Sequence, residues 1–314
     1  MKTCIIGLGS IGKRHTKNLV TVLEKRGYAF EIDALRSSRA ALPDEIDKIV
    51  QNEYYCADEM PDDYDVIFVT NPTNCHYDTM KRVLTKTRHM FIEKPVFDSL
   101  AYDLGSLTLR SDSVYYVACP LRHKSVMRYV KEEILSEEKM ISARILSTSY
   151  LPAWRTGVDY RSGYSAHEDM GGGATRDLIH EWDYALDLFG NPIKVYHIKK
   201  HISNLDIDSD DISVYIAEYP DMILEMHLDY IGRKTERVLQ LFTDRKRIDI
   251  DLIGNMIVEY AGDKLISEKS FPKEDCYINE MEYFIDCVER KKSNINTVEN
   301  AYHTLKIALT ENKE

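Results

Sequence analysis

Residues 1–12 read Met1-Lys-Thr-Cys-Ile-Ile-Gly7-Leu-Gly9-Ser-Ile-Gly12. A short apolar run leads directly into a G-x-G-x-x-G turn, and helical sequence follows, which is the context that a dinucleotide-binding fingerprint requires. Gly7 makes the tight turn, Gly9 lets the backbone approach a pyrophosphate, and Gly12 lets helix and strand pack closely. We therefore expect a pyrophosphate at the unpaired N–H groups of this helix end, beside Ser10 and Ile11. The alternative is a glycine-rich loop without a ligand.

Composition excludes several classes of protein. The chain has 314 residues and a net charge of -11, with 41 Lys and Arg against 52 Asp and Glu, which argues against a general nucleic-acid binder. The six cysteines show neither a C-x-x-C pair nor zinc-ligand spacing, so we expect reduced thiols and no metal site. No charged leader precedes an apolar stretch, and no apolar run reaches roughly 18 residues. We expect a cytoplasmic protein that does not cross a membrane.

The first part of the chain, residues 1–119, alternates short apolar strands with helical segments. Strands are expected at 3–6, 31–35, 66–70, 89–92 and 114–118, and helices at 11–26, 76–86 and, more weakly, 101–109. This alternation predicts a doubly wound parallel sheet, a Rossmann domain of an α/β protein.

Residues 120–314 show a different pattern of expected elements and are expected to form a second domain. After a helix at 124–135, strands are expected at 141–150, 193–201, 212–219, 222–230, 237–242, 247–252 and 256–260, and helices at 277–291 and 297–312. Consecutive strands without helices between them predict antiparallel pairing. The absence of a long linker suggests that the two domains pack around a shared cleft.

The end of the second strand discriminates NAD from NADP in a Rossmann domain, because an acid there takes the ribose hydroxyls. Here the strand is followed by Arg36-Ser37-Ser38-Arg39, and Asp33 comes three residues too early if the strand ends at Leu35. Arginine forks suit a phosphate dianion. We therefore favour NADP(H) over NAD(H), with Arg36, Ser37 and Arg39 as contacts. The alternative is that Arg36 stacks on adenine and Asp33 binds the ribose.

Two later strand ends point into the same ligand region. Thr70-Asn71-Pro72 ends the strand at 66–70, and its polar groups could contact the nicotinamide ribose; an ordinary Asn-Pro turn is equally compatible. Glu93-Lys94-Pro95 follows the strand at 89–92. A lysine at such a strand end can hydrogen-bond a substrate oxygen and help move a proton. Without further motifs, this tripeptide would be interpreted as a Glu–Lys pair on the protein surface before a turn.

A second segment strengthens the catalytic interpretation. Gly171-Gly-Gly-Ala-Thr-Arg-Asp177-Leu-Ile-His180-Glu-Trp-Asp183 is a glycine run that opens onto a helix, with an acid and an imidazole three residues apart. Asp177 could fix the tautomer of His180, and His180 could exchange the alcohol proton during hydride transfer. A lone helical histidine would more often be structural.

Together these motifs resemble the Gfo/Idh/MocA oxidoreductase family, named for glucose-fructose oxidoreductase and inositol dehydrogenase, over nearly the whole chain. The resemblance implies an N-terminal Rossmann domain, a C-terminal α/β domain with a large, mostly antiparallel open sheet, and hydride exchange between nicotinamide and a sugar or polyol hydroxyl. It also implies that Lys94, Asp177 and His180 form the catalytic group, with Glu93 beside the cofactor. One departure matters: the family places four positions between acid and histidine, and here Glu181 occupies the fourth. The base is therefore His180 or Glu181.

The stretch from Tyr150 to Ala166 resembles a subgroup associated with bacterial surface sugars, including nonulosonic acids. Its aromatic and arginine side chains could stack on a sugar and hold a carboxylate or phosphate; the alternative is packing against another domain or subunit. Candidate substrate contacts are Trp154, Tyr160, Arg161, His180 and, by resemblance, Arg122.

We thus expect an NAD(P)-dependent dehydrogenase or reductase for a sugar, sugar acid or nucleotide sugar, acting as a homo-oligomer, either dimer or tetramer. The competing functions are a glycosidase that uses tightly held NAD and a non-catalytic nucleotide-sensing regulator of the same fold. Retention of all three catalytic candidates speaks against the regulator.

Overall fold

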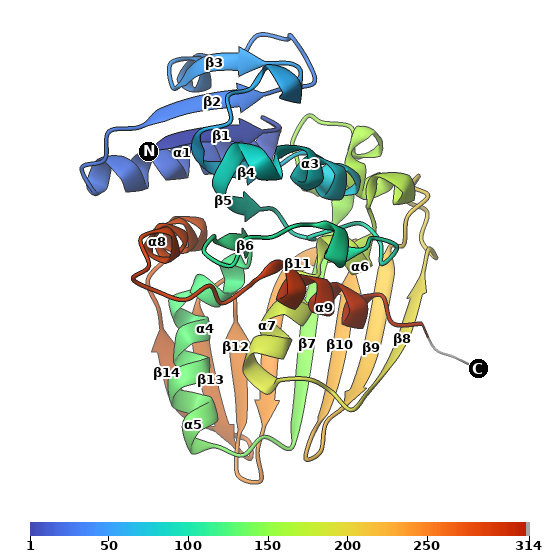
Figure 1. Cartoon of the computed structure of the whole chain (residues 1–314). Coiled ribbons are helices and arrows are strands. Elements are labelled where there is room, and N and C mark those ends of the chain that lie inside the picture. The colour runs from blue at the N-terminus through green and yellow to red at the C-terminus, as the bar shows by residue number, and fades with distance from the viewer. Residues whose placement is uncertain (312–314) are drawn as a thin grey trace. The chain divides into compact units, whose positions relative to one another are not determined.

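The computed structural model describes residues 1–311. Their contacts divide the chain into two compact units. Unit 1 comprises Met1–Pro120 and Asp275–His303, and unit 2 comprises Leu121–Glu274 and residues 304–311 (Figure 1). The sequence analysis assigned the whole region after residue 119 to a second domain, whereas 275–303 packs with unit 1. Within residues 1–311, no helix has the length and apolar character needed to cross a membrane.

Unit 1 contains a six-stranded parallel sheet in the order β3-β2-β1-β4-β5-β6. The strands are β1 (Lys2–Ile6), β2 (Glu31–Leu35), β3 (Val50–Tyr54), β4 (Tyr64–Val69), β5 (Thr87–Ile92) and β6 (Tyr115–Val117). The strand order reverses between β1 and β4, and ligands of open α/β sheets bind at such switch points, outside the carboxyl ends of the strands. The predicted Rossmann sheet is confirmed, although β3 was missed.

The helices of unit 1 are α1 (Ser10–Lys25), α2 (Asp44–Asp47), α3 (His76–Val83) and α8 (Cys276–Val288). The core joins α1 and α8 to the sheet through buried residues that include Leu19, Phe68, Phe91 and Phe284. Arg26, the C-cap of α1, also pairs with Asp286 of α8 and with Glu289, the C-cap of α8, and these pairs add to the contacts that join α8 to this unit. Within the described chain, the segment 101–109 contains only a 3-10 turn at Leu104–Ser106, so the helix expected there is wrong.

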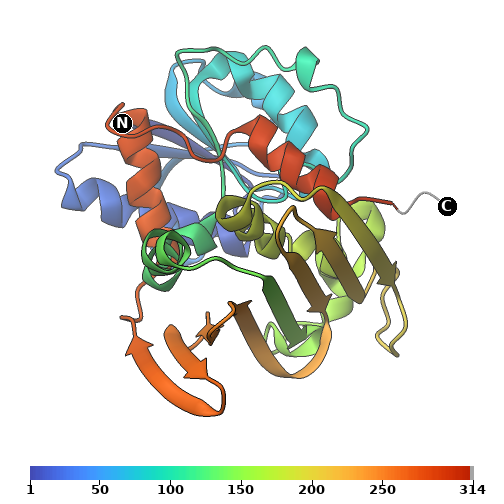
Figure 2. The ribbon, with the colours of Figure 1, turned by 90° about the horizontal axis from the view of Figure 1, so that it is seen from below.

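Unit 2 contains an eight-stranded sheet in the order β14-β13-β12-β11-β7-β10-β9-β8, and all its pairs are antiparallel except β7 with β10. The strands are β7 (Ser142–Tyr150), β8 (Lys194–Lys200), β9 (Ile212–Glu218), β10 (Ile223–Asp229), β11 (Ile231–Phe242), β12 (Arg247–Asp251), β13 (Met256–Ala261) and β14 (Lys264–Ser270). Figure 2 shows this sheet as a curved layer running from β8 to β14. The predicted second, mostly antiparallel sheet is therefore confirmed.

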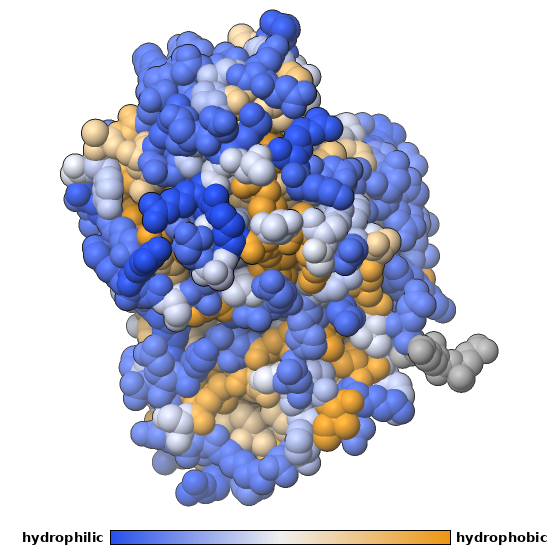
Figure 3. All heavy atoms as spheres, in the orientation of Figure 1, coloured by the Kyte–Doolittle hydropathy of each residue, from blue (hydrophilic) through white to orange (hydrophobic). Residues whose placement is uncertain are grey.

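One face of this sheet is covered and the other is open. The helices of the unit are α4 (Ser125–Tyr129), α5 (Leu135–Glu137), α6 (Ala174–Asp177) and α7 (His180–Phe189), while α9 (Val298–Ala308) is divided between the units. Trp182 of α7 packs edge-on against Tyr215 of β9 at 5.2 Å between ring centroids. On the opposite face, Tyr196, Ile198 and Ile216 are each more than 40% exposed. Figure 3, in the orientation of Figure 1, views the molecule from the side of these helices and shows hydrophobic side chains among a largely hydrophilic surface.

Candidate functional site

The glycines of the first turn are required for different reasons. Gly7 has φ +91°, and a Cβ there would lie 2.7 Å from Cα of Asn71. A Cβ at Gly12 would lie 2.0 Å from the Gly7 carbonyl oxygen. At Gly9, by contrast, φ is -68° and a Cβ would meet no atom of residues 1–311 within 4 Å. The fold itself therefore requires Gly7 and Gly12, whereas nothing in the described protein requires Gly9.

Helix α1 and helix α8 begin differently. The N-cap of α8 is Asp275, whose side chain accepts a hydrogen bond from Tyr277 N–H. The N-cap of α1 is Gly9, and within residues 1–311 no side chain caps this end; its first turn also contains no acidic residue. Gly9 and Ser10 are exposed. The start of α1 therefore presents backbone N–H groups at the positive end of a helix, where anions bind favourably.

At the end of β2, the arginine and the acid have separate partners. Arg36 forms an ion pair with Glu53 of β3, and this hydrogen bond lowers the pKa of Glu53. Asp33 is fully buried and accepts hydrogen bonds from Tyr64 Oη at 2.7 Å and from Asn52 Nδ2 at 2.8 Å. Its carboxylate is thus bound inside the unit, while Arg36 lies at the tip. Glu53 is the acid that the sequence analysis missed.

The rest of this tip is exposed. Ser37 and Arg39 are exposed, and the Arg39 guanidinium lies 4.2 Å from the centroid of the Tyr55 ring. Tyr55 Oη in turn donates to Glu53 at 2.9 Å. Two guanidiniums, a serine and one competing carboxylate therefore surround the tip of β2 and β3.

The turn after β4 is tied to the glycine turn. Thr70 Oγ1 donates to the carbonyl oxygens of Gly7 at 2.7 Å and Ile6 at 3.0 Å, so this hydroxyl supports the turn itself. Asn71 Nδ2 donates to Thr79 at 2.8 Å, and Pro72 precedes the 3-10 turn that leads into α3. The polar side chains of this turn mainly fix its shape.

The segment after β5 carries Lys94, which is partly buried. Glu93 is 6% exposed; its Oε2 accepts the Lys94 N–H at 3.0 Å, and its Oε1 lies 2.5 Å from Nε2 of His15. Burial alone would raise the pKa of Glu93, but the His15 hydrogen bond and the Lys94 charge lower it below its ordinary value. Glu93 is therefore a buried anion beneath Lys94.

In unit 2, Asp177 is the last residue of α6, and its side chain is hydrogen-bonded by a residue that is distant in the sequence. Tyr230, between β10 and β11, donates its hydroxyl to Asp177 Oδ2 at 2.6 Å, and burial raises the pKa of Tyr230 well above its ordinary value. Just before α6, a Cβ at Gly173 would lie 2.2 Å from Asp210 Oδ1, and Thr175 donates to the same carboxylate. Tyr230 was missed because no local pattern links it to Asp177.

The helix expected across Asp177 and His180 is broken. Ile179 N–H donates to Arg176 and Glu181 N–H donates to Leu178, so i to i−3 hydrogen bonds replace the regular pattern between α6 and α7. Residues three apart share a side in such a 3-10 turn, which accommodates the three-residue spacing. Asp177 and His180 are 4% and 9% exposed, so both side chains are buried.

The Glu181 side chain forms an ion pair with Arg237. It is fully buried, and its Oε1 lies 2.7 Å from Nε of Arg237 on β11. An ionised acid buried with an arginine is a structural pair, and proton exchange would leave Arg237 without its counter-charge. This arrangement favours His180 over Glu181 as the base.

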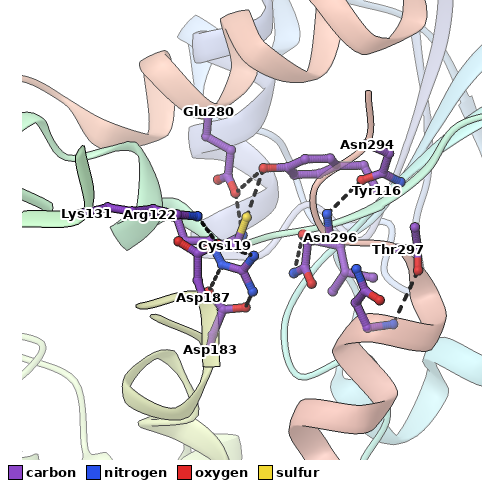
Figure 4. Close-up of polar contacts among 12 residues, drawn as sticks. Tyr116, Cys119, Arg122, Lys131, Asp183, Asp187, Glu280, Asn294, Asn296 and Thr297 are labelled. Atoms are coloured by element: carbon purple, nitrogen blue, oxygen red, sulfur yellow. Dashed lines mark hydrogen bonds and ion pairs between the residues drawn. The ribbon is translucent and has the colours of Figure 1, made fainter. Parts of the chain in front are cut away.

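Arg122 is engaged within unit 2. Its guanidinium binds Asp183 through two hydrogen bonds of 2.8 and 2.7 Å and approaches Asp187, which also pairs with Lys131 (Figure 4). Burial raises the pKa of Asp183 against the opposing effect of Arg122. Binding a substrate anion would require Arg122 to leave this pair, so its predicted substrate role stays a prediction.

The loop after β7 presents the remaining candidates. Trp154 packs edge-on against Tyr230 at 5.2 Å and donates from Nε1 to Ser149. Arg161 is exposed and pairs with Asp159 on the same loop, while Tyr160 Oη accepts the Asp206 N–H at 3.1 Å. Trp154 is therefore linked through Tyr230 to Asp177, whereas Arg161 is part of a local surface ion pair.

The family model GFO_IDH_MocA, described as the oxidoreductase family with the NAD-binding Rossmann fold, matches residues 1–103. The "Uncharacterized oxidoreductase YrbE" of Bacillus subtilis (strain 168) is 36% identical to this chain over 99 residues, which are 31% of this chain and 28% of that protein. The match thus spans just over a quarter of that relative's length.

Solved structures share the fold over nearly the whole chain. Myo-inositol 2-dehydrogenase from Lactobacillus plantarum is 19% identical with a TM-score of 0.77, covering 98% of this chain and 95% of that one. The WlbA dehydrogenase from Bordetella pertussis, in complex with NADH and UDP-GlcNAcA, is 14% identical with a TM-score of 0.77 and coverage of 98% and 94%. Biliverdin reductase from Synechocystis sp. PCC 6803, in complex with biliverdin and NADP+, is 14% identical with a TM-score of 0.78 and coverage of 98% and 96%.

At such low identities these likenesses show the fold alone. The family match, by contrast, rests on the residues that form the glycine turn and the strand ends of unit 1. Residues 1–103 are therefore similar to the NAD-binding Rossmann part of the Gfo/Idh/MocA oxidoreductase family, as the sequence resemblance predicted for this part of the chain.

Proposed function

We propose that the protein is an NAD(P)-dependent oxidoreductase that transfers a hydride between nicotinamide and a hydroxyl or keto group of a sugar, sugar acid or nucleotide sugar. One observation carries the proposal: the uncapped start of α1, the Asn71 turn and Lys94 follow three neighbouring parallel strands, β1, β4 and β5. Gly9, Ser10 and Ile11 would hold the pyrophosphate there. The open space around Gly9 supports this role, since a glycine that the fold does not need is explained by a ligand.

The proposed catalytic residues are Lys94, Asp177 and His180. When bound, the nicotinamide supplies the hydride acceptor. Lys94 donates a hydrogen bond to the reacting oxygen and stabilises its developing negative charge. His180 removes the alcohol proton, and Asp177, which Tyr230 orients, favours the charged imidazole.

We further propose a preference for NADP(H). Asp33, the alternative ribose ligand, is buried with both oxygens occupied, whereas Arg36, Ser37 and Arg39 lie at the tip of β2. A 2′-phosphate would compete with Glu53 for Arg36 and gain charge-assisted hydrogen bonds from both arginines.

Two different kinds of observation support the proposed substrate class. Two of the solved relatives are named for, or bound to, a polyol or a nucleotide sugar, although the biliverdin reductase shows that the fold also serves another substrate. In this chain, Trp154 offers an aromatic face beside Tyr230, which suits stacking on a sugar ring. Tyr160 and Arg161 extend that loop, and a role in bacterial surface-carbohydrate metabolism belongs to the same proposal.

The proposal includes a cytoplasmic homo-oligomer. The face of β8 and β9 that carries Tyr196, Ile198 and Ile216 is apolar and exposed, as expected of a surface that a second copy covers. Sedimentation of the purified protein, compared with a variant carrying Ile198→Lys and Ile216→Lys, tests this part. A dimer or tetramer that the double substitution dissociates is the expected result.

The test of the reaction is a panel of free sugars, sugar acids and nucleotide sugars, each incubated with NAD+ and with NADP+ while the reduced nicotinamide is followed by absorbance. Oxidation of at least one compound with net cofactor turnover is expected. Glycoside cleavage without net cofactor turnover would favour the glycosidase. Dinucleotide binding without any reaction across the panel would favour the regulator.

A further inference from the structure

Two buried histidines in unit 1 have no part in the proposed mechanism. His15 on α1 is fully buried and His76 on α3 is 1% exposed. Both contact the segment 93–96, which carries Lys94, and they do so from opposite ends of that segment. Burying a polar side chain costs free energy because the side chain loses its hydration on folding, and hydrogen bonds within the protein must offset that cost.

His15 acts through Glu93. The ring packs among aromatic side chains, with its centroid 4.8 Å from that of Phe91, and Nε2 lies 2.5 Å from Glu93 Oε1. Nδ1 is buried and has no hydrogen-bond partner among residues 1–311. A proton on Nδ1 would be a buried donor without an acceptor, so we assign the neutral tautomer that carries its proton on Nε2. His15 therefore donates to the Glu93 carboxylate.

That carboxylate joins the helix to the lysine backbone. Its second oxygen, Oε2, accepts the N–H of Lys94 at 3.0 Å, and Glu93 N–H donates to the Val69 carbonyl at 2.9 Å. The chain of contacts therefore runs from α1 through His15 and Glu93 to the main chain of Lys94. Since α1 starts at the proposed pyrophosphate site, the same helix borders that site and supports the main chain of Lys94.

His76 holds the other side of the lysine. Its Nδ1 lies 3.1 Å from the Pro95 carbonyl oxygen and 3.2 Å from that of Val96, and its Nε2 lies 3.0 Å from the Asn71 carbonyl oxygen. Burial lowers the pKa of His76, so the neutral ring donates on one side at a time. The ring lies between the turn after β4 and the segment after β5, and with its proton on Nδ1 it donates to the segment after β5.

We infer that His15 and His76 are positioning residues: they fix the main chain on both sides of Lys94 and thereby set where its ammonium group stands relative to the dinucleotide. The catalytic part of this inference rests on the proposed function. The structural part does not, because it concerns hydrogen bonds of the protein alone. A misplaced catalytic group costs up to ~10²-fold in rate even when every group is present.

The chain offers a matched control. His89 lies on β5 itself, is 4% exposed, and accepts the Val114 N–H through Nδ1 at 2.9 Å. Burial lowers its pKa to about 4. His89→Phe therefore removes one buried histidine and its hydrogen bond with Val114 from β5, the strand that precedes Lys94. It removes no hydrogen bond to the segment 93–96.

The first experiment measures hydrogen exchange of the Lys94 amide by NMR in the protein without added nucleotide. In His15→Phe, which keeps a ring in the aromatic cluster, Glu93 loses its donor and this amide should exchange about tenfold faster than in His89→Phe. His15→Gln retains a side-chain N–H and should restore part of the protection. Equal exchange in His15→Phe and His89→Phe would overturn the inference.

A second variant covers the case in which His15→Phe does not fold. Glu93→Gln keeps the volume but has one carbonyl oxygen where the carboxylate offers two, so it cannot accept from both His15 and Lys94. Faster exchange of the Lys94 amide is expected here as well. An unchanged exchange rate in folded Glu93→Gln would contradict the chain of contacts.

The second experiment uses a substrate found in the panel. His15→Gln and His76→Gln should lower kcat by about tenfold while KM for the dinucleotide changes less than twofold, because the pyrophosphate site is intact. His89→Phe should leave kcat unchanged. A loss shared equally by the control would assign the histidines to stability alone. If the panel yields no substrate, the exchange experiment still decides the positioning claim for His15, and only the proposed function fails.

Discussion

Units 1 and 2 hold their proposed catalytic side chains in different ways. In unit 1, Lys94 is held through its main chain, because neighbouring carbonyl and N–H groups bond to buried Glu93 and His76. In unit 2, Asp177 is held through its side chain, which accepts the Tyr230 hydroxyl from a junction between two strands. A main-chain anchor fixes the backbone from which the lysine side chain extends, whereas a side-chain anchor fixes the carboxylate itself. In the proposed mechanism, the first anchor would place the cation and the second would place the acid that orients the base.

Replacement of Lys94 tests whether the side chain that the main-chain anchor positions has the proposed catalytic role. Lys94→Ala should lower turnover by ~10²-fold or more, with dinucleotide affinity little changed, because it removes only the group that polarises the reacting oxygen. Steady-state rates and a nucleotide titration measure the two quantities. Lys86→Ala is the control, since Lys86 donates to the Met60 carbonyl elsewhere in unit 1. Near-normal turnover in folded Lys94→Ala would reject the catalytic assignment.

In unit 2, the comparison is sharpened by two neighbouring residues. If His180 is the base for alcohol oxidation, the rate should rise with pH as its ring loses a proton, and His180→Asn should abolish that rise and cost about 10²-fold. Glu181→Gln should keep the pH dependence but lower stability by about 3 kcal/mol, because it breaks the buried pair with Arg237. The roles must be exchanged if Glu181→Gln erases the pH dependence and His180→Asn preserves it.

The glycine turn separates a ligand requirement from a folding requirement. Gly9→Val should leave the melting temperature near that of the wild type yet weaken dinucleotide binding by about 30-fold, because only the ligand needs the space. Gly12→Val should instead destabilise the protein, since its Cβ would meet the Gly7 carbonyl oxygen. Thermal unfolding and a nucleotide titration of both variants provide the test. Unchanged binding in Gly9→Val would remove the pyrophosphate from this helix end.

The smallest expected effect concerns cofactor preference. Arg36→Ala should weaken NADPH about tenfold and NADH little, whereas Glu53→Gln should strengthen NADPH, because the competing carboxylate is removed. Titration of both nucleotides into each variant gives the ratio of affinities. An NADH preference that Arg36→Ala leaves unchanged would refute the NADP(H) proposal.

Features encoded by adjacent residues could be predicted from the sequence. The glycine turn, the strands around it and the Lys94 strand end depend on short-range patterns, and the Rossmann sheet followed from them. The second sheet was also predictable, since its strands follow one another without helices. The edge strands β3 and β14 were missed because they are largely exposed and lack a clear apolar run.

Contacts between distant residues could not be predicted. Tyr230 and Arg237 come from β-strand regions far along the chain, and no local pattern marks them as partners of Asp177 and Glu181. The break between α6 and α7 was likewise invisible, because the apolar spacing there fits a continuous helix. The placement of α8 in unit 1 depends on buried contacts such as those of Phe284 and on ion pairs with Arg26, which form only in the folded chain.

Hydride transfer itself is the central claim, and isotope transfer tests it most directly. The reactive compound from the panel is prepared with deuterium at all its carbon-bound hydrogen positions and incubated with NADP+, and the reduced nucleotide is analysed by mass spectrometry. We predict one deuterium in each reduced nicotinamide formed by the wild type, and its formation at least ~10²-fold slower with Lys94→Ala. Reduced nicotinamide without deuterium, or equal rates in the two proteins, would contradict the account.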